Sequence, residues 1–104
     1  MIEKAELRRN LRTGQFSIEV TIEGYVNNLW DGIVERCAKS YSNSELREIY
    51  DSCHNQIEEM GSENVPLHFK EMLDELNQTI INRKAYRINK PELRIGVEDD
   101  YDYR

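Results

Sequence analysis

The sequence has few cysteines, few prolines and no long apolar run. No stretch approaches the roughly 20 apolar residues that a membrane-spanning helix needs, and Met1–Lys4 lacks an apolar segment of the secretory type. The only two cysteines are Cys37 and Cys53, and in a reducing compartment they are most simply small core residues. We therefore expect a soluble, cytoplasmic protein that has no membrane partner and no disulfide.

Catalytic and cofactor-binding motifs are also absent. The chain has no Gly-rich phosphate loop, no Ser-centred elbow and no pair of Cys-x-x-Cys units. His54 and Glu58 lie four residues apart on a predicted helix, a spacing that can share one metal ion. Two such residues are a common coincidence in an acidic helix, so we expect no metal and no cofactor. Carboxylates on polar helix faces are normally solvated, and we do not expect an enzyme.

Basic residues are concentrated near the two ends of this acidic chain. The formal net charge is −6, with 14 Lys and Arg against 20 Asp and Glu. Residues 1–12 carry a net charge of +2 and residues 83–94 carry +4, whereas residues 13–82 carry −9 and residues 98–104 carry −3. A surface selected only for solubility would mix its signs, so this pattern indicates a place for an anion. The acidic pI of about 4.9 argues against general binding to duplex nucleic acid.

The clearest local signal is an N-terminal antiparallel β-hairpin. Asn10 suits the opening of a type I turn, and Gly14 suits a position that needs positive φ. Pairing Asn10 with Gln15 places all the apolar residues of both strands on one face of the sheet. The predicted pairs are Arg9 with Phe16, Leu7 with Ile18, Ala5 with Val20 and Glu3 with Ile22. A helix over residues 2–11 is the alternative, and we prefer the hairpin.

Three amphipathic helices are predicted after the hairpin, because apolar residues recur at spacings of three and four. The first helix begins at Asn27 or Asn28 and ends at Tyr41. Residues 42–44 cap the second helix, which ends at Gly61, and Pro66 suits the first turn of the third. Their apolar stripes are Leu29, Trp30, Ile33, Val34, Cys37 and Tyr41; Leu46, Ile49, Tyr50, Cys53, Ile57 and Met60; and Val65, Phe69, Met72, Leu73, Leu76 and Ile80.

Beyond Asn82 the apolar pattern changes from helical spacing to alternation. Tyr86 and Ile88, followed by a turn and the run 93–95, predict one or two short C-terminal strands that complete a small sheet with the hairpin. Residues 97–104 are acidic and lack an apolar period, so we expect a frayed tail. The predicted fold class is α+β, with residues 1–96 in a single compact domain.

The basic segment that begins at Arg83 predicts a ligand site. Guanidinium groups bind phosphate bidentately, and an aromatic ring beside them offers a stacking surface for a nucleobase. Sheet pairing of the C-terminal strands would bring the hairpin arginines to the same place. The predicted ligand-binding residues are Arg8, Arg9, Arg12, Arg83, Lys84, Tyr86 and Arg87. The alternative is a basic helix end that only complements the helix macrodipole.

These observations favour a non-enzymatic protein that sequesters a phosphate-bearing ligand of the nucleotide class stoichiometrically. In size, acidity and lack of catalytic motifs, the chain resembles accessory proteins of bacteriophages and mobile elements, which often act by binding. The alternative function is an acidic inhibitor or adaptor that blocks a basic surface of a host protein. The acidic residues concerned are Glu58, Glu59, Glu63, Glu71, Asp74 and Glu75. Because a small domain leaves much surface uncovered, we also expect a homo-oligomer, most simply a symmetric dimer.

Overall fold

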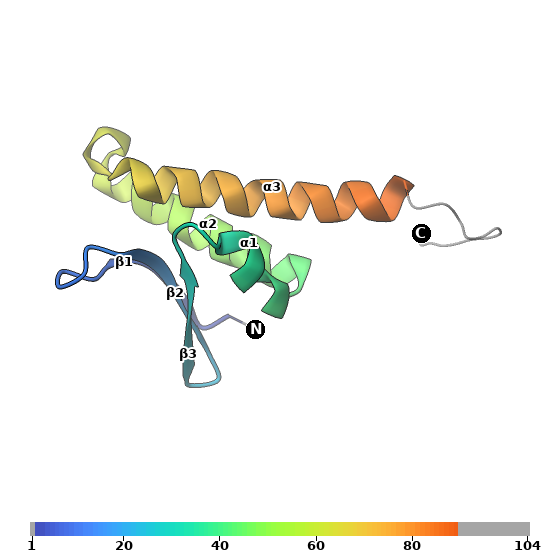
Figure 1. The fold of residues 1–104 in the computed structure, drawn as a ribbon, viewed down its shortest axis with the longest axis horizontal. Helices are drawn as coiled ribbons and strands as arrows, with labels where there is room; N and C mark the ends of the chain where they lie inside the picture. Colours follow the sequence, from blue (N-terminus) through green and yellow to red (C-terminus); the bar gives the residue numbers. More distant parts are fainter. Residues whose placement is uncertain (1, 90–104) are drawn as a thin grey trace.

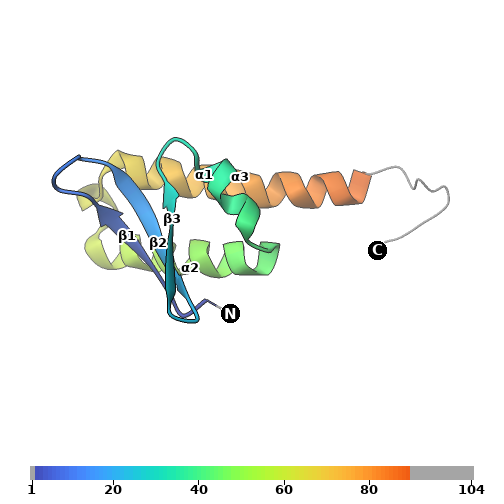
Figure 2. The same ribbon diagram turned by 60° about the horizontal axis from the view of Figure 1, so that its bottom comes forward.

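The computed structural model describes the backbone of residues 2–89 and the side chains of residues 2–84. The fold is α+β, with one three-stranded antiparallel sheet and helices that pack on one of its faces (Figures 1 and 2). The strands are β1 (Lys4–Arg9), β2 (Phe16–Ile22) and β3 (Tyr25–Trp30), in that order across the sheet. The helices are α1 (Val34–Cys37), η1 (Ala38–Ser40), α2 (Asn43–Met60), η2 (Ser62–Asn64) and α3 (Leu67–Asn89).

The N-terminal hairpin forms with the predicted register. Leu7 of β1 lies opposite Ile18 of β2, and the neighbouring pairs follow the same alignment. The side-chain oxygen of Asn10 accepts hydrogen bonds from two N–H groups of the turn, at 2.9 and 3.1 Å. Gly14 adopts a φ of 79°, which is in the left-handed region. The two residues that predicted the turn therefore stabilise it.

The third strand is β3, and the helix predicted from residue 27 or 28 to residue 41 is wrong. Glu23 and Gly24 adopt φ values of 49° and 83°, and positive φ at both central positions is typical of a type I′ hairpin turn. This turn returns the chain alongside β2. Gly32, with a φ of 90°, then separates the strand from a short helical segment over residues 34–40. The helical spacing arose because Leu29, a buried residue of β3, happens to precede the apolar residues of α1 at intervals typical of a helix.

The second predicted helix is confirmed as α2. The Ser42 hydroxyl accepts a hydrogen bond from the Glu45 N–H at 3.2 Å, and the Glu45 carboxylate accepts one from the Ser42 N–H at 2.9 Å. This reciprocal pair is a capping box, and Gly61 with a φ of 88° takes the C-terminal cap. Four residues of the predicted apolar stripe are buried, whereas Tyr50 is half-buried and Met60, at the end of the stripe, is 46% exposed.

The third predicted helix is longer than expected, and the strand predicted at residues 86–88 is wrong. Helix α3 begins at Leu67, directly after Pro66, and continues through Asn89. Its residues include no glycine and no proline, and extending an existing helix needs no new nucleation step. Two alternating apolar residues do not outweigh that advantage. The predicted strand at 93–95 and the predicted tail lie outside the described residues.

The hydrophobic core lies between the sheet and the helices, with α2 against both β1 and α3 (Figure 1). Its largest fully buried side chains come from the sheet and from all three α-helices. They are Ile18, Val20, Leu29, Val34, Leu46, Ile49, Cys53, Met72, Leu76 and Ile80. Within residues 2–89, no helix is both long and apolar enough to cross a membrane.

The outer edge of β1 is covered by side chains of α2. The Gln56 side-chain oxygen accepts a hydrogen bond from the Leu7 N–H at 3.0 Å. The Ala5 carbonyl accepts hydrogen bonds from the Gln56 amide nitrogen at 2.6 Å and from the Ser52 hydroxyl at 2.9 Å. One edge of the sheet is thereby satisfied within the chain, and β3 forms the other edge.

Candidate functional site

Arg83 lies where α3 packs against the connection between α1 and α2. Its guanidinium group donates hydrogen bonds to the carbonyls of Ala38, at 3.1 Å, and Tyr41, at 2.9 Å. A third bond goes to the side-chain oxygen of Asn43, at 3.1 Å. Among the described residues, the other two of the five guanidinium N–H donors have no partner. The side chain is therefore held in one orientation with hydrogen-bonding capacity left over.

A hollow of about 240 Å³ opens beside Arg83. Helix α3 contributes Thr79, Asn82 and Arg83 to its walls, and the α1–η1 segment contributes Glu35 and Lys39. The walls thus carry two cations, one carboxylate and one amide. Ligand sites usually measure about 300–1,000 Å³, so this hollow suits a group of phosphate size and not a whole nucleotide. We call it the Lys39–Arg83 hollow.

The other predicted residues of the basic segment follow Arg83 along α3. Lys84 is exposed. Tyr86 and Arg87 belong to the described helical backbone, although their side chains are not among those described. Arg87 follows Arg83 by four residues, so the two positions share one side of the helix. Lys39 was not among the predicted residues, because it is an isolated cation in a segment far from Arg83 along the chain.

The hairpin arginines are not brought to this site. The turn between β1 and β2 and the C-terminal half of α3 lie at opposite ends of the molecule (Figures 1 and 2). Arg8 pairs with Glu19 at 3.2 Å, and the Arg9 guanidinium lies 5.1 Å from the centre of the Phe16 ring. Arg12 is exposed in the turn. A ligand role for these three residues stays a prediction, but they and Arg83 do not converge.

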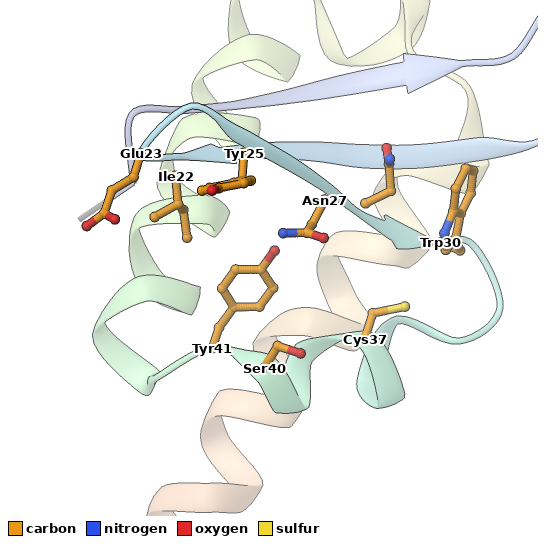
Figure 3. A pocket seen from close by; sticks show the side chains of 9 residues that line it. Ile22, Glu23, Tyr25, Asn27, Trp30, Cys37, Ser40 and Tyr41 are labelled. Carbon is orange, nitrogen blue, oxygen red and sulfur yellow. The ribbon is translucent and has the colours of Figure 1, made fainter.

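A larger hollow of about 540 Å³ lies beside β3, where a helix was predicted. It contains the aromatic residues Tyr25, Trp30 and Tyr41 and the amides Asn27 and Asn28. Figure 3 shows Asn27 and Tyr41 pointing toward one another across the opening. Of the residues whose side chains the structure describes, neither lysine nor arginine lines it, so these residues do not provide the charge that a phosphate group needs.

The Tyr41 hydroxyl is a neutral group at this larger hollow. Burial of the residue, with smaller contributions from Glu45 and Cys37, raises the pKa of Tyr41 above its usual value of 10.0. At neutral pH the hydroxyl therefore keeps its proton and can both donate and accept a hydrogen bond.

Cys53 is a core residue, as predicted. It is fully buried, and burial raises the pKa of its thiol to about 12. At neutral pH the thiol is therefore protonated and is not a thiolate nucleophile. Cys37 is half-buried, and both cysteines are free thiols.

His54 and Glu58 lie within ion-pair distance, with 3.6 Å between the imidazole Nε2 and a carboxylate oxygen. In the part of the chain that the structure describes, no group of three or more His, Cys, Asp or Glu residues is placed to hold a metal ion. The pair therefore has no third side-chain ligand among these residues.

The acidic segment, residues 58–75, presents its carboxylates to solvent. It carries six acids and one lysine, a net charge of −5. All six acids are exposed, and among the side chains of residues 2–84 only Glu58 lies within ion-pair distance of a basic side chain, the imidazole of His54. The acids are Glu58, Glu59, Glu63, Glu71, Asp74 and Glu75.

Comparison with protein-family models, with curated proteins and with solved structures finds no match to this chain. A functional assignment therefore has to rest on the chain's own residues and their geometry.

Proposed function

We propose that the protein binds a phosphate-bearing ligand of the nucleotide class stoichiometrically and without catalysis, with the phosphate group in the Lys39–Arg83 hollow. The observation that supports this most is the anchored guanidinium group of Arg83, which is held by three hydrogen bonds beside a hollow that a second cation also lines. Arginine stays charged at all physiological pH values, and its planar donors match phosphate oxygens.

Anchoring makes Arg83 a better anion ligand than a freely mobile arginine. Immobilising a long side chain on binding costs about 0.5–1.5 kcal/mol, and here the fold has already fixed the side chain. Lys39 adds a second positive charge from the opposite element, while Glu35 limits the net charge of the walls to about +1. The rest of a nucleotide would extend from the hollow along α3, past positions 84–87.

Replacing Lys39 with alanine is expected to weaken binding about tenfold without lowering the melting temperature. A charge-assisted hydrogen bond contributes about 1.5–3 kcal/mol, and the exposed position of Lys39 favours the lower end of that range. Calorimetry with inorganic phosphate, pyrophosphate and mono-, di- and cyclic nucleotides measures the dissociation constants. The matched control is Arg36→Ala, which removes an exposed cation of α1 that does not line the hollow.

Two results would contradict this proposal. One is that none of these anions binds the wild-type protein. The other is that K39A and R36A weaken binding equally, because the effect would then reflect net charge and not a site.

We propose, as the second candidate, that the acidic segment binds a basic surface of a partner protein. The observation that favours it is the exposure of all six carboxylates, of which only Glu58 contacts a basic side chain, that of His54, among the side chains of residues 2–84. Exposed, unpaired charges of one sign steer an oppositely charged partner and set the rate of its association. This function does not require the Lys39–Arg83 hollow.

The triple variant E58K/E59K/E63K is expected to lose capture of such a partner, whereas K39A keeps it. Affinity capture from the host should recover one basic protein in near-equal amount, and binding should fall as salt rises from about 0.1 M to about 1 M, where the Debye length drops from about 10 Å to about 3 Å. The control E3K/E48K/D51K changes the net charge equally at other exposed acids. Equal loss in both triple variants, or capture that is insensitive to salt, would exclude a specific role of the acidic segment.

A further inference from the structure

Strand β3 presents main-chain N–H and C=O groups along its outer side, away from β2. The Asp31 N–H donates to the Phe16 carbonyl at 3.1 Å, and hydrogen-bonded pairs recur at every second residue of an antiparallel ladder. From the β2–β3 register, the odd-numbered residues of β3 bond to β2, and the N–H and C=O groups of Val26, Asn28 and Trp30 point away from the sheet. This edge is the one next to the larger hollow.

Most of these outward groups have no partner within residues 2–89. The Trp30 carbonyl accepts a hydrogen bond from the Ile33 N–H at 3.1 Å, and no hydrogen bond within these residues involves the other outward groups. The opposite edge of the sheet differs, because Ser52 and Gln56 of α2 bond to the outer groups of β1. Within residues 2–89, the fold thus covers one edge of the sheet and leaves the other open.

The open edge also lacks the usual protection against strand pairing. Edge strands are normally protected by charged residues, by proline or by bulges. Residues 25–30 include no charged residue and no proline, and they pair with β2 without a bulge. Tyr25 and Val26 are 75% and 54% exposed. An uncharged, partly apolar edge of six residues is suited to the addition of another strand.

We propose that a second copy of this chain pairs with this edge, with the two β3 strands antiparallel about a two-fold axis at Asn28. The outward-pointing residues are spaced symmetrically about Asn28, so the same three positions can serve both copies, as a two-fold interface requires. The sheets of the two copies then form one continuous six-stranded sheet. This interface is separate from the Lys39–Arg83 hollow and does not depend on the proposed ligand.

The side chains are also compatible with this register. Val26 of one copy lies opposite Trp30 of the other, so an exposed apolar residue meets an aromatic ring across the strands. Asp31 lies opposite Tyr25 of the other copy, and no like charges lie opposite each other between residues 25 and 31. Two copies with a net charge of −6 repel each other in general, and an edge without charge is where they can approach. The larger hollow leaves space beside the added strand.

Substitutions at Asn28 test both the partner and the register. N28K and N28D each place like charges at the axis, and each is expected to raise the dimer dissociation constant tenfold or more, since like charges facing each other across an interface cost several kcal/mol. Mixing the two variants places opposite charges at the axis and should restore the dimer. Sedimentation of the full chain, with a protomer mass of 12.4 kDa, measures the association.

Two further variants separate this interface from other causes. The Asn28 side chain accepts a hydrogen bond from the Ser17 hydroxyl at 3.0 Å, so V26D repeats the disruption at an exposed residue without touching that bond. L11K is the control, because Leu11 is 90% exposed in the turn between β1 and β2 and does not belong to β3. It should leave the dissociation constant unchanged.

Three outcomes would overturn the proposal. A wild-type monomer at micromolar concentration would mean that the edge is free or serves another partner. Dimers that persist in N28K, N28D and V26D would place the interface elsewhere. Failure of the mixed Asn28 variants to associate would contradict the two-fold register.

Discussion

Replacing Leu76 with alanine is expected to lower the free energy of unfolding by about 3 kcal/mol, whereas the same change at Leu67 should lower it by less than about 0.5 kcal/mol. Both leucines belong to α3. Leu76 is fully buried in the core, and Leu67 is 65% exposed at the start of the helix. The pair therefore isolates burial from helix propensity, because the chemical change and the secondary structure are the same.

The size of the Leu76 effect follows from two losses. The first is the free energy gained when the leucine side chain is transferred from water to the core. The second is the loss of van der Waals contacts around the cavity that the truncation leaves. Together these two losses cost about 2–5 kcal/mol for Leu→Ala in cores. A domain is typically stable by only about 5–15 kcal/mol, so one such change removes a large share. Urea unfolding followed by the helical circular dichroism signal measures both variants. Similar losses at the two positions would mean that α3 does not pack as described.

The parts of the fold that were predictable depend on interactions between residues close together in the sequence. The hairpin turn is stabilised by Asn10 and Gly14, and α2 begins at a capping box over residues 42–45. The turn and the capping box each involve hydrogen bonds between residues that lie within a segment of six residues. The types of the residues therefore determine the local geometry with little help from the rest of the chain.

Strand β3 was missed because its stability comes from pairing and not from local propensity. Its ladder partners lie on β2, and burial of Leu29 depends on the helices that cover the sheet. Leu29 and Ile33 happen to lie four residues apart, as do Trp30 and Val34, and this imitates helical spacing. The pair Glu23-Gly24 is the sequence feature that indicates β3, because a glycine in a two-residue connection after a strand favours a β-hairpin.

The candidate site was predictable only in part, for the same physical reason. The basic cluster that begins at Arg83 was visible in the sequence, and Arg83 does line a hollow with a second cation. Lys39 was not predictable, because packing of α3 on the α1–η1 segment is what brings it to Arg83. The hairpin arginines were assigned to the site through a C-terminal strand at residues 86–88, and that segment is helical.

Replacing Arg83 with alanine is expected to lower the free energy of unfolding by about 2–3 kcal/mol. The variant removes three hydrogen bonds and leaves the Tyr41 carbonyl without its donor, whereas the Ala38 carbonyl still accepts a hydrogen bond from the Tyr41 N–H at 3.0 Å. Hydrogen bonds to a charged group contribute about 1.5–3 kcal/mol each, but they are not additive, and this guanidinium is only half-buried. The control is Lys84→Ala, which removes the next cation of the same helix from an exposed position. It should change stability by less than about 0.5 kcal/mol.

Arg83→Lys separates the charge from the hydrogen-bond geometry. Lysine keeps the positive charge, but its single ammonium group cannot reach the carbonyl oxygens of Ala38 and Tyr41 and the side chain of Asn43 with the planar fork that arginine provides. We therefore expect R83K to fall between the wild type and R83A in urea unfolding. If R83K matches the wild type, the charge alone matters, and the basic end of α3 only complements the helix macrodipole. If R83A is as stable as K84A, the three hydrogen bonds do not hold α3 to the α1–α2 connection, and the anchored guanidinium that supports the proposed phosphate site is lost with them.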